Sequence, residues 1–203
     1  MAEIKALFWD VGGVLLTNGW DRRERQNAAQ KFHLDWEDFE DRHELVVGRF
    51  ETGKLSLDRY LDRTVFYRPR NFQKDVFKVY MFDQSKPIDG TLAVVERIAH
   101  TGRYLLSTLN NESRELNLYR IEHFGLRKYF STFMSSCFLG VKKPEDEMFR
   151  LALDLTQREP EECLFVDDRE LNLECAARLR LQTLHFRSAA QIEKDLRSAG
   201  LEF

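Results

Sequence analysis

The stretch that decides the fold lies at residues 4–14 and reads IKALFWDVGGV. Its first six residues are mostly apolar and too few for a helix, which is typical of a strand buried on both faces of a parallel sheet. The run ends at Asp10, and Gly12 and Gly13 follow it closely. Since glycine lets the backbone approach a bound anion, we expect a binding site where this strand ends.

Strand and helix patterns alternate along the rest of the chain. Four further short apolar runs lie at residues 103–107, 131–135, 163–166 and 182–186. Segments with helical periodicity lie before, between and after these runs, at residues 89–101, 112–124, 144–157, 169–179 and 189–199. Several helical patterns stop at a glycine such as Gly102, and one begins at Pro144, which is the expected placement of these residues. The alternation predicts an α/β fold, a three-layer Rossmann-like parallel sheet with helices on both faces.

One segment, residues 18–86, interrupts this alternation and is called the insert below. It contains no convincing strand, but it has helical patterns at residues 20–33, 35–48, 56–65 and 71–82 and a predicted turn at residues 50–54. We therefore expect a small all-α cap domain inserted after strand one, and a core domain made of residues 1–17 and 87–203. Ligands of open parallel sheets bind at the carboxyl ends of the strands, so such a cap would cover the site.

The composition of the chain indicates which binding partners and which cellular compartment to expect. The 203 residues carry a net charge of −3, so no basic excess points to nucleic acid or to an anionic membrane surface. No apolar run approaches the roughly 18 residues of a membrane-spanning helix, and the first strand begins too early to leave room for a signal peptide. The 3 cysteines have no metal-ligand spacing. We expect a cytoplasmic protein with reduced thiols, and the sequence leaves monomer and homodimer open.

Chemically useful side chains recur where the predicted strands end. The set consists of Asp10, Ser107, Thr108, Lys143, Asp167 and Asp168. Carboxylates are the oxygen ligands that a divalent cation prefers, and hydroxyl, backbone and lysine donors suit a phosphate. Because the adjacent acids Asp167 and Asp168 repel each other unless a cation or base lies between them, we expect these residues to form one site.

The order of these motifs resembles that of the haloacid dehalogenase superfamily over essentially the whole chain. The first motif corresponds to FWDVGGVL at residues 8–15, the second to Leu106-Ser107, the third to Lys143-Pro144 and the fourth to Val166-Asp167-Asp168, with Asn172 following. Within the superfamily the chain is similar to the subgroup of bacterial α-D-glucose-1-phosphate phosphatase and the N-terminal phosphatase domain of soluble epoxide hydrolase. The insert is similar to the small helical cap of that subgroup.

The resemblance implies a magnesium-dependent phosphoric monoester hydrolase that acts on a small phosphorylated metabolite of the sugar phosphate class. Asp10 would attack phosphorus and form an aspartyl-phosphate. Mg²⁺ would be held by Asp10, the Gly12 carbonyl and Asp168, with Asp167 bound directly or through water. The phosphoryl oxygens would be held by Ser107, Thr108, Lys143 and the backbone of Gly12 and Gly13, with Ser107 and Lys143 also acting in catalysis.

The chain departs from the usual pattern at Gly12, where most phosphatases of the superfamily carry a second Asp as general acid and base. Three interpretations stay open. The phosphatase reaction survives without that acid and favours leaving groups of low pKa, or the site binds phosphate without catalysis, or the chain is a 2-haloacid dehalogenase or a phosphonatase. The acid pair argues against a metal-free dehalogenase, and no lysine of the insert has a recognisable Schiff-base context. Asp21 and His43 of the insert are candidate substitutes for the missing acid.

Overall fold

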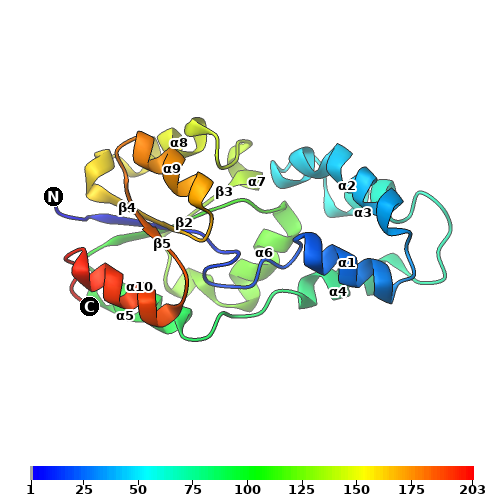
Figure 1. Cartoon of the computed structure of the whole chain (residues 1–203), viewed down its shortest axis with the longest axis horizontal. Helices are drawn as coiled ribbons and strands as arrows, with labels where there is room; N and C mark the ends of the chain where they lie inside the picture. The colour runs from blue at the N-terminus through cyan, green and yellow to red at the C-terminus, as the bar shows by residue number, and fades with distance from the viewer. Residues whose placement is uncertain (1) are drawn as a thin grey trace.

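The core of the protein is a parallel sheet of five strands in the order β3-β2-β1-β4-β5. The computed structural model describes residues 2–203 and places the strands at β1 Ala6–Trp9, β2 Leu105–Asn110, β3 Thr132–Ser135, β4 Cys163–Asp167 and β5 Gln182–His185. All neighbouring strands pair in parallel (Figure 1). The predicted Rossmann-like α/β fold is therefore confirmed.

Helices cover both faces of this sheet and make the three layers (Figure 1). Alternate residues of β1 show the division: Leu7 and Trp9 belong to the apolar cluster of helices α5 (Thr91–Thr101) and α10 (Ala189–Ser198). Ala6 and Phe8 belong to the cluster of α8 (Asp146–Thr156) and α9 (Glu170–Arg178). Because β1 is buried on both sides, its sequence is continuously apolar rather than alternating. Helix α6 (Arg114–His123) follows β2, and the short α7 (Ser136–Leu139) follows β3.

The insert forms four helices, as its sequence predicts, at α1 Arg22–Lys31, α2 Trp36–Glu51, α3 Leu57–Thr64 and α4 Lys74–Asp83. They pack around an apolar cluster of their own that is rich in aromatic rings. Phe50 stacks on Tyr60 with ring centroids 4.1 Å apart, and the Trp20 indole N–H donates to the Tyr60 hydroxyl. Leu116 of α6 belongs to the same cluster, so the insert rests on that helix.

The structure shifts several predicted boundaries, and two of the helix shifts matter for the insert and the site. Helix α2 continues to Glu51, so the turn expected over residues 50–54 begins at Thr52, because Phe50 packs into the insert cluster as part of the helix. Helix α8 begins at Asp146, so Pro144 is not in its first turn and Lys143 is not at its N-terminus. The turn that precedes α8 is held instead by a bond from the Glu145 N–H to the Lys142 carbonyl.

Among residues 2–203, none of the helices combines the length and the hydropathy that crossing a membrane requires.

Candidate active site

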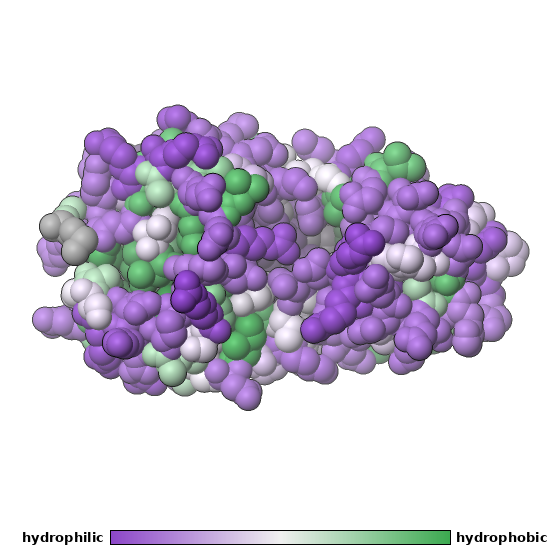
Figure 2. Space-filling view, viewed as in Figure 1, coloured by the Kyte–Doolittle hydropathy of each residue, from purple (hydrophilic) through white to green (hydrophobic). Residues whose placement is uncertain are grey.

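A cavity of about 440 Å³ lies between the carboxyl edge of the sheet and the insert. The space-filling view shows the surface hollowed between these two parts, with mostly hydrophilic residues around the hollow (Figure 2). The core contributes Asp10, Gly12, Asn111, Glu112, Arg120, Lys143 and Asn172 to the lining, and the insert contributes Asn18, Trp20, Asp21, Arg25, His43, Glu44, Phe50 and Glu51. Residues of the insert therefore line the same cavity as the residues that follow the strands.

Three carboxylates converge at the floor of this cavity. Asp10 follows β1, Asp167 ends β4 and Asp168 follows it, and each offers an oxygen within 4.8 Å of the others. The strand register explains the meeting, because β1 pairs with β4 and the Asp10 N–H donates to the Val166 carbonyl at 2.9 Å. Three acids so close repel one another unless positive charge lies among them.

Lys143 supplies part of that charge. Its buried ammonium lies 3.1 Å from Asp10 Oδ1 and 2.6 Å from Asp167 Oδ2. The Asn111 side chain fixes the backbone of Lys143, since its amide donates to the Lys143 carbonyl and its oxygen accepts from the Lys143 N–H. Although burial lowers it, the two carboxylates raise the pKa of Lys143 above its ordinary value, so the side chain stays charged.

The three acids differ in how many donors they already have. Asp167 accepts from Lys143, from the Asn172 amide and from the Arg169 N–H. Asp168 Oδ1 is buried, and no hydrogen-bond partner for it occurs among residues 2–203. Asp167 is therefore committed to positioning Lys143, whereas Asp10 and Asp168 retain oxygens for another ligand.

Burial and mutual repulsion disfavour the charged forms of the two available acids. Burial raises the pKa of Asp10 to about 7; Lys143 opposes this, and the charges of Asp167 and Asp168 add to it. Burial, followed by the charge of Asp167, also raises the pKa of Asp168. A divalent cation between Asp10 and Asp168 would relieve both effects, so the donor set fits Mg²⁺.

Gly13 makes room for this arrangement. Its backbone is left-handed, with φ of +80°, and a Cβ built on it would lie 2.3 Å from Asp168 Oδ2. Both the conformation and the space therefore require glycine here. The loop after β1 thus lets its backbone pass close beside the acid cluster.

We expect Gly13→Ala to destabilise the protein by about 1–2 kcal/mol through its backbone conformation alone, and to weaken Mg²⁺ binding by displacing Asp168. Urea unfolding without metal and calorimetric titration with Mg²⁺ measure the two effects. Gly48→Ala is the matched control, because Gly48 lies within α2 and a Cβ there meets nothing within 4 Å. A Gly13 variant as stable as the Gly48 variant would contradict the argument.

The structure does not bring Ser107 and Thr108 to the cavity. Both are fully buried within β2, which runs to Asn110 rather than ending near residue 107. The Ser107 and Thr132 hydroxyls lie 2.5 Å apart, and β2 pairs Thr108 with Trp9 before the strand edge is reached. At the end of β2 the cavity is lined instead by Asn111 and Glu112. The polar run NNES at residues 110–113 was the signal that could have located this end.

The two acids suggested from the insert are also poorly placed to donate a proton. The His43 ring nitrogen Nδ1 lies 2.8 Å from the Tyr60 hydroxyl, and burial lowers the pKa of His43 to about 4, so the ring is neutral near pH 7. Asp21 caps α1 and lies 3.4 Å from Arg169 Nη2. Both line the cavity, but the His43 ring carries no extra proton to donate, and Asp21 is held by the first turn of α1 and by Arg169.

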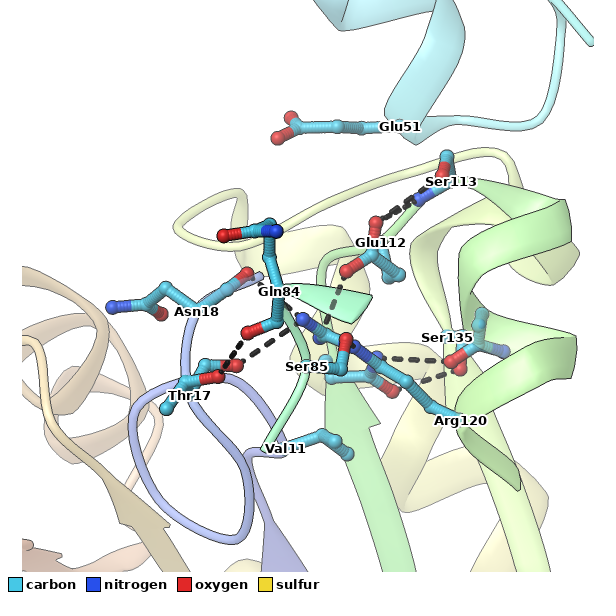
Figure 3. A network of polar contacts seen from close by, with 12 residues as sticks. Val11, Thr17, Asn18, Glu51, Gln84, Ser85, Glu112, Ser113, Arg120 and Ser135 are labelled. Atoms are coloured by element: carbon cyan, nitrogen blue, oxygen red, sulfur yellow. Dashed lines mark hydrogen bonds and ion pairs between the residues drawn. The ribbon is translucent and has the colours of Figure 1, made fainter. Parts of the chain in front are cut away.

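A buried ion pair at the cavity wall was not expected from the sequence. Arg120 Nη1 of α6 lies 2.8 Å from Glu112 Oε2. The same guanidinium donates to the carbonyls of Thr17 and Asn18 and to the Ser85 hydroxyl (Figure 3). Arg120 therefore ties together the two segments that connect the insert to the core.

The chain is similar to known proteins both in sequence and in fold. The chain is 27% identical over 160 residues to flavin mononucleotide hydrolase 1 of Arabidopsis thaliana, which covers 79% of this chain and 64% of the relative. It is 21% identical over 211 residues to bifunctional epoxide hydrolase 2 of Sus scrofa, which covers 95% of this chain and 38% of the relative. The chain therefore spans less than two thirds of the length of either relative.

Solved structures share the fold. The HAD family enzyme BT-2542 of Bacteroides thetaiotaomicron superposes with a TM-score of 0.79 at 21% identity, covering 92% of this chain and 95% of that one. Its complex with magnesium and inorganic phosphate superposes with a TM-score of 0.75 at 19% identity, covering 91% and 95%. The profile of haloacid dehalogenase-like hydrolases matches residues 4–179. With most of its length matched, the chain belongs to the haloacid dehalogenase-like hydrolases.

Proposed function

We propose that this hydrolase is a magnesium-dependent phosphatase that cleaves a small phosphorylated metabolite through a phosphoryl group carried on Asp10. The observation that carries the proposal is the cluster at the cavity floor, where Lys143 bridges Asp10 and Asp167. In the same cluster, Asp168 has a buried oxygen with no hydrogen-bond partner among residues 2–203. The names of the relatives support it, since one hydrolyses flavin mononucleotide and one structural neighbour binds magnesium and inorganic phosphate.

Each residue of the cluster has a definite task in this proposal. Asp10, Asp168 and the Gly12 carbonyl would hold Mg²⁺, which when bound neutralises charge that develops on the phosphoryl group. The Asp10 carboxylate attacks phosphorus in line with the departing oxygen. Lys143 contacts the phosphoryl oxygens and holds Asp10 in position. Asp167 fixes the ammonium of Lys143 by direct contact, and the Asn172 amide in turn donates to Asp167.

Asn111 takes the place that we expected for Ser107. Its side chain holds Lys143 by two hydrogen bonds, and it lines the cavity where β2 has just ended. Its backbone N–H and that of Gly12 would donate to an incoming anion. The Gly13 N–H, which we expected among these donors, donates instead to the Leu16 carbonyl at 2.7 Å.

The substrate is a small molecule because the insert forms one wall of the cavity. A volume of about 440 Å³ is in the range of small-molecule pockets, and the insert would hinder access of macromolecules. In this proposal residues 18–86 act as a cap domain over a core domain of residues 1–17 and 87–203, and the substrate belongs to the sugar phosphate class. The cluster of three acids favours this reaction over a 2-haloacid dehalogenase, which would keep no cation there.

Hydrolysis of p-nitrophenyl phosphate with and without Mg²⁺ tests the proposal. We expect turnover that chelation with EDTA abolishes and added Mg²⁺ restores. Binding of phosphate without turnover of any ester would favour the non-catalytic interpretation instead. Release of chloride from 2-chloropropionate without metal would favour a dehalogenase.

Gly12 also predicts which esters react fastest. Since position 12 carries no acid, we expect kcat/KM to fall by about 10²-fold or more from p-nitrophenyl phosphate to simple alkyl phosphates, which is within the usual contribution of a general acid. The parameter kcat/KM is chosen because it reports phosphoryl transfer to Asp10 rather than later steps. Equal kcat/KM values across leaving groups of different pKa would contradict this prediction.

A further inference from the structure

The pair of Glu112 and Arg120 is built into the wall of the cavity rather than exposed on its rim. Glu112 is 8% and Arg120 1% exposed, and both line the cavity. Glu112 Oε2 accepts from Arg120, while Oε1 accepts from the Ser113 N–H at 2.8 Å and from the Ser113 hydroxyl at 3.2 Å (Figure 3). These three donors hold the Glu112 carboxylate in one position.

This carboxylate lies on the Gly12 side of the cavity. A Cβ built on Gly12 would lie 3.6 Å from Arg120 Nη1 and 3.1 Å from Asn18 Oδ1. The same Arg120 nitrogen is 2.8 Å from Glu112. Beside position 12 the cavity wall therefore carries the Arg120 guanidinium, and the same nitrogen of that guanidinium contacts the Glu112 carboxylate.

The other acids that line the cavity have different commitments. Asp10 belongs to the acid cluster. Glu51 lies 2.8 Å from Lys142, and Asp21 lies near Arg169. Glu44 is exposed to solvent. Glu112 alone among the cavity-lining acids of residues 2–203 is both buried and outside the acid cluster.

We propose that Glu112 is the general base that activates water for release of the phosphoryl group from Asp10. This inference rests on the proposed function. In the step, a water oxygen forms a bond to phosphorus and the bond between phosphorus and Asp10 Oδ breaks. One water proton moves to the Glu112 carboxylate, and inorganic phosphate and the free Asp10 carboxylate remain. Arg120 is a positioning residue that holds the Glu112 carboxylate.

The surroundings of Glu112 suit a base. Burial raises the pKa of Glu112, while the charge of Arg120 and the Ser113 donors limit the rise. A carboxylate with a raised pKa accepts a proton more readily than an ordinary glutamate. Glu112 is also near the insert, since its N–H donates to the Ser136 hydroxyl, which in turn donates to the Glu51 carbonyl.

The test is Glu112→Gln in the full chain with Mg²⁺ and p-nitrophenyl phosphate, followed by rapid mixing. The first step needs no base, so we expect a burst of p-nitrophenol that approaches one equivalent per enzyme. Steady-state turnover then falls by about 10²-fold or more below the wild type. Protein quenched after the burst carries a phosphoryl group on the peptide that contains Asp10. A residue with a purely structural role would not produce such a burst.

Two further variants separate chemistry from folding. Glu24→Gln is the matched control, because Glu24 is buried, lies 3.1 Å from Arg23 and does not line the cavity. We expect it to keep wild-type turnover. Glu112→Asp keeps a charge for Arg120 but retracts the carboxylate, and we expect the same burst with a smaller fall in turnover.

Three results would overturn the inference. The first is wild-type steady-state turnover in folded Glu112→Gln protein. The second is an equal loss of the burst rate and the steady-state rate in both Glu112 variants, which would mean that Glu112 acts only on the structure. The third is a wild-type protein that does not hydrolyse the ester with Mg²⁺, which would refute the proposed function itself and is recognised before any variant is made.

Discussion

Asp10→Asn is expected to lower kcat for p-nitrophenyl phosphate by about 10⁴-fold or more, as loss of a nucleophile does in other covalent mechanisms. The amide has the shape of the carboxylate but cannot attack phosphorus. Lys143 would keep its short contact to Asp167, so the fold should survive the change. Initial rates at saturating Mg²⁺, together with thermal unfolding, measure both expectations.

Asp89→Asn is the control, because Asp89 is exposed and lies just before α5, outside the cavity lining. It should leave rate and stability unchanged. Turnover of the Asp10 variant within tenfold of the wild type would mean that another group takes the phosphoryl, or that water attacks the ester directly.

Lys143→Met is expected to impair both activity and stability. The buried ammonium contacts two carboxylates, and removing it leaves Asp10 and Asp167 together without their shared cation. Breaking a buried ion pair by removing one partner typically costs about 3–5 kcal/mol. Activity should fall because the phosphoryl oxygens lose their charged contact and because the pKa of Asp10 rises further, which leaves less of the nucleophile ionised.

Urea unfolding of the metal-free protein at pH 7 measures the loss of stability. Lys142→Met is the neighbouring control: its partner Glu51 is partly exposed, and such pairs contribute about 0–1 kcal/mol. Equal losses in the two lysine variants would contradict the role of Lys143.

The sequence alone predicts those parts of the fold in which burial determines the type of residue. All five strands lie where short apolar runs predict them, because strands of a parallel sheet are buried on both faces and leave a continuous signal. Asp10, Lys143 and Asp167 were also predicted together correctly, since parallel strands that end in acids necessarily meet at one edge of the sheet.

The residue at which β2 ends could not be predicted from the sequence in the same way. Ser107 and Thr108 interrupt an apolar run, and small polar residues mark either a strand end or a buried position whose hydroxyl finds a partner. Ser107 has such a partner in Thr132, which is 25 residues away and belongs to the next strand. The predicted donors Ser107 and Thr108 therefore lie four and three residues before Asn111, which lines the cavity.

The contact between Glu112 and Arg120 could not be predicted from the sequence either. The two residues lie eight positions apart on a loop and a helix, a spacing that predicts no contact within one helix. Their contact depends on the packing of α6 against the two segments that connect the insert to the core, which Arg120 contacts at Asn18 and Ser85. A substitute for the missing acid at position 12 was therefore sought in the insert, whereas the geometry points to the core.

The central claim is that Asp10 itself carries the phosphoryl group. Acid quenching of the wild-type enzyme during turnover of p-nitrophenyl phosphate, followed by mass spectrometry of its peptides, tests this claim most directly. We predict one phosphoryl group on the peptide that contains Asp10, present with Mg²⁺ and absent from Asp10→Asn protein. Steady release of phosphate with no modified peptide, or with the phosphoryl group on another residue, would contradict the account.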